Sequence, residues 1–343
     1  MSSIFTGVGW HMAGAAAAAS FYAPIEKVRR WSWETTWIVA GIFSWILLPL
    51  AVSGLLLPHF LAFYQSIPRE VVVFTFLFGC MWGIGNVNYG LTMRYLGMSL
   101  CIGVAIGVTL VVGTLIPPIV HGRLLYLLTS RSGRFLIAGI LLALVGIAVV
   151  SWAGHLKEQR LGLRAEEFNL QKGLLLAVLC GIFSSGMSFA IDAAHPIALA
   201  AQHAGVRPLY AALPSYVIIM GGGALINFGY CFFRLAFRKD ISLRQDLSQP
   251  HRILWINSAM AASGGILWYF QFFFYAWGAA SIPLRLSFIN WMLHMSGYVL
   301  FGGLVGLVLG EWREARGRPV RLLWAGMILL MIAANLVGLG SAS

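Results

Sequence analysis

The sequence predicts an all-α membrane protein with ten transmembrane helices arranged as two inverted five-helix repeats. Three observations support this fold class. The 343-residue chain is 59% hydrophobic and only 10% charged, whereas a soluble domain carries about 25% charged residues. Its apolar residues fall into repeated runs of about 20, the length that spans a bilayer. The longest internal polar stretch, 155–172, divides these runs into two sets of five.

Proline, glycine and charged residues separate the apolar runs. The predicted spans are roughly 4–24, 36–57, 71–92, 98–120, 135–154, 173–194, 211–233, 253–275, 287–309 and 322–340. The first run lacks a basic leader and continues into Tyr22-Ala23-Pro24, so we expect a retained span rather than a signal peptide.

The connecting loop at 155–172 leaves residues 1–154 as the first repeat and 173–343 as the second. Because each repeat has an odd number of spans, the second inserts upside down relative to the first. Inverted repeats of this kind recur in transporters, with the substrate site near mid-membrane.

The positions of Lys and Arg predict the orientation. Of the 23 basic residues, 17 lie in odd-numbered loops and 6 in even-numbered loops. Basic residues concentrate in cytoplasmic loops. We therefore expect a multi-pass protein of the bacterial inner membrane with both termini in the periplasm.

The composition also argues against several partners and activities. The net charge of +12 is scattered over short connections, so no segment offers a basic face for nucleic acid. The four cysteines lie in apolar runs without metal-ligand spacing, and we expect neither metal nor cofactor. No Ser/His/Asp constellation appears and the loops are short, so an enzyme is not expected. The lipid bilayer is the expected surrounding, and no obligatory protein partner is evident.

The third span carries an unusual concentration of polar and aromatic residues. Trp82, Asn86, Asn88 and Tyr89 share nine residues with three glycines. An amide supplies a donor and an acceptor, which suits a pair of sugar hydroxyls, and an indole offers a flat face to a sugar ring. The alternative is that the amides of Asn86 and Asn88 tie helices together.

The eighth and ninth spans carry further candidates. Trp268 and Gln271 lie in an aromatic stripe that is otherwise explained by packing or by an interfacial belt. Asn290 and His294 are four residues apart and share a helix face, with Trp291 between them. His294 is a candidate proton carrier because histidine titrates near neutral pH. A neutral, hydrogen-bonded histidine is the alternative.

Two more ionisable residues are candidates for proton coupling. His11 lies in the first span, and Asp192 follows an apolar stretch with no other acid. Ionisable side chains in lipid are costly and usually functional. Asp192 is instead unremarkable if it lies at the external mouth.

Several strings make the chain resemble the bacterial L-rhamnose–proton symporters of the drug/metabolite transporter superfamily. They are RWSWET (30–35), MWGIGN (81–86), NYGLTMRYLGMS (88–99), AEEFNL (165–170), LPSYVIIMGGG (213–223) and QFFFYAWG (271–278). The resemblance implies ten helices and uptake of L-rhamnose, or a related deoxy or six-carbon sugar, with a proton. It also implies that Tyr216 belongs to the sugar site.

One region departs from the family pattern. Where members carry Gln-Tyr-Asp-Tyr before the ninth span, this chain has Arg285-Leu286-Ser287-Phe288. Conversely, Asp192 stands where they carry Asn, and His195 where they carry Lys. We hypothesise that Asp192 takes over the role of the missing carboxylate. The expected function is proton-coupled sugar uptake by alternating access, and the alternative is a metabolite or drug exporter with the same fold.

Overall fold

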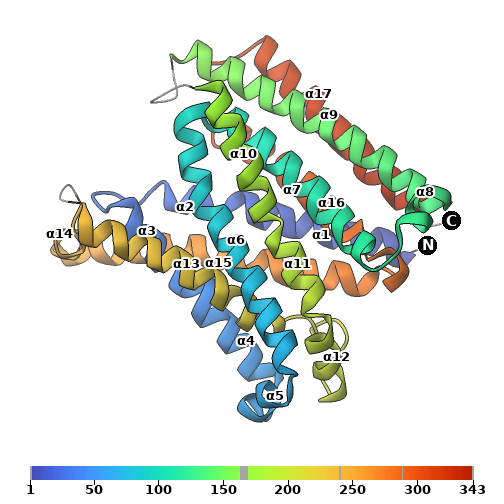
Figure 1. Cartoon of the computed structure of the whole chain (residues 1–343). Coiled ribbons are helices and arrows are strands. Elements are labelled where there is room, and N and C mark those ends of the chain that lie inside the picture. The colour runs from blue at the N-terminus through green and yellow to red at the C-terminus, as the bar shows by residue number, and fades with distance from the viewer. Residues whose placement is uncertain (1, 163–168, 239–240, 288, 342–343) are drawn as a thin grey trace.

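A computed structural model of the chain describes residues 2–162, 169–238, 241–287 and 289–341, and within these ranges every regular element is a helix (Figure 1). The loop residues 163–168 and Phe288, which entered the family comparison, lie outside the described residues.

Nine helical segments of the described chain are long and apolar enough to cross a membrane. They are α3–α4 (Trp33–Leu56), α6 (Arg69–Leu96), α7 (Met98–Val120), α9 (Arg131–Arg160), α10–α12 (Leu170–His203), α13 (Ser215–Phe237), α15 (His251–Ser281), α16 (Ile289–Val308) and α17 (Arg318–Ser341). The first helix, α1 (Ser2–Ser20), is outside this set because Ser, Thr, Gly and His11 dilute its apolar residues.

Short helices complete the connections between these segments. They are α2 (Tyr22–Ile25), α5 (Phe60–Ser66), α8 (Leu124–Thr129), α14 (Leu243–Leu247) and the 3₁₀ turn Leu284–Leu286.

Two of the spans are not continuous α-helices. The segment α3–α4 consists of α3 (Trp33–Gly41), a π-helical stretch η1 (Ile42–Leu47) and α4 (Leu48–Leu56). The π-helical stretch precedes Pro49, which lacks the N–H that an α-helix would use there. The other is divided into α10 (Leu170–Ser184), α11 (Gly186–Ala193) and α12 (His195–His203).

The helices form a bundle with a peripheral pair. α9 and α17 run side by side along one edge (Figure 1). Inside the bundle, α1 packs on α15 and α16, while α6 packs on α10 and α13. Glycine permits close approach of the helices: a Cβ at Gly79 of α6 would lie 2.2 Å from the carbonyl oxygen of Ile219 on α13.

Candidate functional site

Three helices bring together the polar side chains of the first, eighth and ninth predicted spans. His11 of α1 is hydrogen-bonded through Nε2 to Oδ1 of Asn290 on α16, at 2.9 Å. One turn further along α16, His294 Nε2 is 3.1 Å from Oε1 of Gln271 on α15. All four side chains are buried, and the two imidazole rings are 6.4 Å apart. We refer to these four residues as the imidazole–amide cluster.

The hydrogen bonds of Gln271 determine how its histidine partner is protonated. Its Nε2 donates to the carbonyl oxygen of Trp268 at 2.8 Å, so Oε1 faces His294 as an acceptor. His294 must then carry its hydrogen on Nε2. The Nδ1 atoms of His294 and His11 are buried without a hydrogen-bond partner in the described chain. An unprotonated Nδ1 is a lone-pair acceptor that can take up one proton.

One aromatic ring contacts both imidazoles. Tyr275 of α15 makes edge contacts with His11 at 4.9 Å and His294 at 5.3 Å between ring centroids. Trp291 of α16 lies 6.3 Å from Tyr275, and its Nε1 donates to the carbonyl oxygen of Thr109 at 3.0 Å. The cluster is therefore enclosed by aromatic side chains that exclude water.

Three tryptophans form a second cluster beside the first. Trp82 of α6 stacks on Trp268 of α15 with centroids 5.4 Å apart and planes 23° apart. Trp45 of η1 meets both edge-on, at 6.1 and 6.2 Å. The Nε1–H of Trp45 is buried without a partner in the described chain, so it is a donor free for a hydroxyl group. Gln271 connects this indole cluster to the imidazole–amide cluster because it is bonded to the backbone of Trp268.

The other candidates of the third and seventh spans lie around or away from this site. Asn86 is half-buried, one turn from Trp82 on α6. Tyr216 is buried with its ring 4.6 Å from Phe272, and the ring of Phe272 lies 5.0 Å from Trp268. By contrast, Asn88 donates to the carbonyl oxygen of Leu176, a bond between α6 and α10.

Tyr89 packs with the small core around Leu96 and Cys101, toward the C-terminal end of α6. The structure therefore places Asn86 and Tyr216 beside the indole cluster and separates Asn88 and Tyr89 from it.

Asp192 lies at the end of α11 and is exposed. Its carboxylate is 2.9 Å from Nε2 of His121, and the two side chains are 43% and 56% exposed. Ser287 is also exposed. Asp192 therefore makes its hydrogen bond to His121 and not to either histidine of the imidazole–amide cluster.

The other carboxylates of the described chain also lie away from the imidazole–amide cluster. They occupy helix ends and connections: Glu26, Glu34, Glu70, Glu158, Asp246, Glu311 and Glu314. Among the described residues there is no group of three or more His, Cys, Asp or Glu that could hold a metal ion.

Sequence reasoning missed two residues of this site. Tyr275 stands in the aromatic string that the sequence explains by packing, and only its edge contacts with both imidazoles set it apart. Trp45 lies in an apolar run in which the small Ser44 is its one polar neighbour, and the unpaired indole N–H becomes visible only in the folded chain.

Comparison with known proteins now identifies the family. The sequence profile of the L-rhamnose-proton symport protein (RhaT) family matches residues 1–343. The chain belongs to this family. It is 58% identical to the L-rhamnose-proton symporter of Escherichia coli O17:K52:H18 (strain UMN026 / ExPEC) over 342 residues, which cover all of this chain and 99% of that relative.

The L-rhamnose-proton symporter of Shigella boydii serotype 18 (strain CDC 3083-94 / BS512) matches with the same identity and coverage. The resemblance inferred from the six sequence strings is confirmed. The family is one of transporters, and the chain is therefore not an enzyme but a multi-pass membrane protein.

Proposed function

We propose that this protein takes up L-rhamnose, or a related deoxy sugar, together with a proton across the bacterial inner membrane by alternating access. The observation that carries the proposal is the junction of an indole cluster with buried amides and imidazoles, in a member of the L-rhamnose–proton symport family. A neutral sugar calls for flat apolar faces and neutral hydrogen-bonding groups rather than paired charges.

The proposed topology has ten crossings, which are the nine apolar segments and α1. Two termini on the same side require an even number of crossings. Both lie at the end of the bundle that carries α8 (Figure 1). A Cβ at Gly338, near the C-terminus, would lie 3.7 Å from Val8 of α1. The excess of basic residues in odd-numbered loops supports periplasmic termini.

The helix contacts also support two inverted repeats, 1–154 and 173–343, with the connecting loop 155–172 in the cytoplasm. If α1, α3–α4, α6, α7 and α9 correspond to α10–α11, α13, α15, α16 and α17, contacts of one repeat recur in the other. The pair α6 and α10 then corresponds to α15 and α1, and the pair α7 and α9 to α16 and α17.

The sugar is proposed to bind between the two clusters. Trp82, Trp268 and Trp45 supply apolar faces and one free indole N–H. Gln271 and Asn290 hold the two imidazoles beside the sugar, and Asn86 and Trp291 lie at the edge of the site. Tyr216 supports the indoles from behind, while Asn88 and Tyr89 shape α6 from a distance.

The proton is proposed to bind at His11 or His294. Among the described residues, every carboxylate lies at a helix end or in a connection, with Asp192 at the break between α11 and α12, whereas the two imidazoles lie roughly 8 to 15 Å inside uninterrupted helices. Asp192 with His121 is exposed at the outer end, where it suits proton entry better than coupling inside the bundle.

Sugar and proton favour each other's binding in this arrangement. A buried imidazolium is costly unless its new N–H finds a partner. A sugar hydroxyl that accepts from Nδ1–H supplies that partner, so each ligand raises the affinity for the other by the same factor. No cofactor other than the coupling proton is required.

Uptake into proteoliposomes tests the proposal. An inward proton gradient is imposed and L-rhamnose is compared with L-fucose, L-lyxose and L-mannose. We expect accumulation of L-rhamnose that collapses when the gradient is dissipated. Outward transport of another solute with no accumulation of any of these sugars would favour the exporter alternative, although neither relative named above is described as an exporter.

A further inference from the structure

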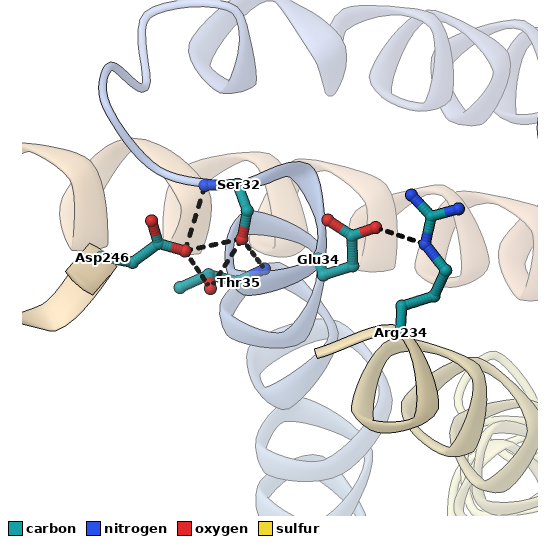
Figure 2. A network of polar contacts seen from close by, with 5 residues as sticks. All are labelled: Ser32, Glu34, Thr35, Arg234 and Asp246. Carbon is teal, nitrogen blue, oxygen red and sulfur yellow. Dashed lines mark hydrogen bonds and ion pairs between the residues drawn. The ribbon is translucent and has the colours of Figure 1, made fainter. Parts of the chain in front are cut away.

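A carboxylate from the second half of the chain completes the N-terminal end of α3 (Figure 2). Asp246 of α14 accepts hydrogen bonds from Ser32 N at 3.1 Å, Ser32 Oγ at 2.6 Å and Thr35 Oγ1 at 2.6 Å. Ser32 is the N-cap residue of α3. A negative charge at a helix N-terminus is stabilised by the free N–H groups there. Asp246 is buried and more than 200 residues away in sequence, so this contact is a tertiary one.

A second acid on the same helix end forms an ion pair with α13. Glu34, in the first turn of α3, accepts from Nε of Arg234 at 2.9 Å (Figure 2). The Glu34 side chain is only 4% exposed. Arg234 lies in the last turn of α13, where a positive charge is favoured by the helix dipole. Both helix ends therefore gain from this pair.

The polar contact between the opposite ends of the same two spans is weaker. There, the Tyr64 hydroxyl of α5 donates to the carbonyl oxygen of Pro214, just before α13, at 2.8 Å. This is a neutral hydrogen bond, whereas those to Asp246 and Glu34 involve a charged group and are about twice as strong. The polar contacts are therefore stronger at the end predicted to be cytoplasmic, whereas the outer end is held by apolar packing that includes Leu57, Phe63 and Leu213.

We propose that Asp246 with Ser32 and Thr35, together with the Glu34–Arg234 pair, forms a cytoplasmic latch that must open for sugar release. The proposal rests on the proposed transport function and topology, because alternating access requires the two repeats to separate on one side at a time. These are positioning residues, because they contact neither sugar nor proton. Their contacts determine the free energy needed to separate α3 from α13 and α14.

A native cysteine reports the state of the latch. Cys231 is buried on α13, less than one turn before Arg234. Its thiol interacts electrostatically with both Glu34 and Arg234. Opening the latch exposes the thiol to the cytoplasm. Its reaction with a membrane-impermeant maleimide in inside-out vesicles is followed by mass spectrometry of the peptide that contains Cys231.

Asp246→Ala removes the acceptor of three hydrogen bonds. It is expected to raise the labelling rate of Cys231 at least tenfold in the absence of sugar, because loss of even one charge-assisted hydrogen bond produces a change of about that size. The matched control is Gln245→Ala, an exposed neighbour on α14, which leaves the rate unchanged. In the unmodified protein, L-rhamnose with a proton gradient is expected to raise the same rate.

Thr35→Val removes a donor from the other side of the latch and keeps the branched shape of the side chain. It is expected to raise the labelling rate of Cys231 as well. If Asp246→Ala is no longer monodisperse, Thr35→Val is the variant that tests the latch. Unchanged labelling in both variants, with intact L-rhamnose uptake, overturns the latch. If the variants are labelled faster but the unmodified protein accumulates no sugar, the proposed function alone is overturned.

Discussion

Replacing His294 by Gln separates the structural role of this residue from its proposed role in proton coupling. The imidazole makes one hydrogen bond to another side chain, from Nε2 to Oε1 of Gln271 at 3.1 Å. A glutamine amide can donate to the same acceptor, so the loss of stability stays on the order of 1 kcal/mol. What the amide cannot do is bind a proton near neutral pH.

The distance between the imidazoles fixes the expected stoichiometry. Two charged rings 6.4 Å apart repel each other by about 2.6 kcal/mol at an effective dielectric constant of 20. The pair therefore carries one proton at a time. One proton for each sugar gives an accumulation of about tenfold for each pH unit across the membrane, since one unit corresponds to about 1.4 kcal/mol.

The assay is L-rhamnose accumulation in proteoliposomes at several imposed pH differences, with the membrane potential clamped at zero. We expect about tenfold accumulation for each pH unit in the unmodified protein and a ratio near one when the imidazole that carries the proton, His294 or His11, is replaced by Gln. Exchange of labelled for unlabelled sugar at equal pH should persist in the variant. His203→Gln, the same change at an exposed histidine of α12, is the matched control.

The reasoning is refuted if folded His294→Gln and folded His11→Gln each still accumulate sugar about tenfold for each pH unit. Accumulation near a hundredfold for each unit in the unmodified protein would also contradict it, because both imidazoles would then carry protons.

The remaining predictions concern the outer acid, the indole cluster and the topology. Asp192→Asn is expected to slow uptake but to preserve its accumulation ratio, since the carboxylate is exposed and paired with His121; loss of accumulation with intact exchange would instead support Asp192 as the coupling group. Gly223→Ala would place a Cβ 2.1 Å from Cζ3 of Trp82 and displace the indole, at a cost of about 1–3 kcal/mol. We expect it to raise the KM for L-rhamnose about tenfold, whereas Gly221→Ala, whose nearest neighbour is 3.8 Å away, should leave KM unchanged. Reporter fusions after Lys239 and after Arg207 should report cytoplasmic and periplasmic locations, and a periplasmic report after Lys239 would reverse the proposed orientation.

Most of the helical segments could be predicted from the sequence because lipid imposes a local rule. A spanning segment must satisfy its own backbone hydrogen bonds and remain apolar for about 20 residues. The predicted span 98–120 coincides with α7, and 211–233 lies close to α13 at Ser215–Phe237. The sixth span departs from this simple picture because it breaks twice and continues through α12 to His203.

The candidate site was only partly visible in the sequence. Histidines and amides inside apolar segments are conspicuous in a sequence, which is why His11, Gln271, Asn290 and His294 were candidates. Whether an amide faces a ligand site or another helix is not a local property. Asn86 and Asn88 are two residues apart on one helix, yet only Asn88 bonds to α10.

The sequence by itself determined the class of protein, most of its helices, the predicted orientation and the family, because each depends on composition or on contiguous strings of residues. The tertiary structure decided which polar groups meet. His11 and Asn290 are separated by 279 positions, and Ser32 and Asp246 by 214. Helix packing alone brings them within hydrogen-bonding distance, because periodicity along one helix carries no information about which other helix its polar face will contact.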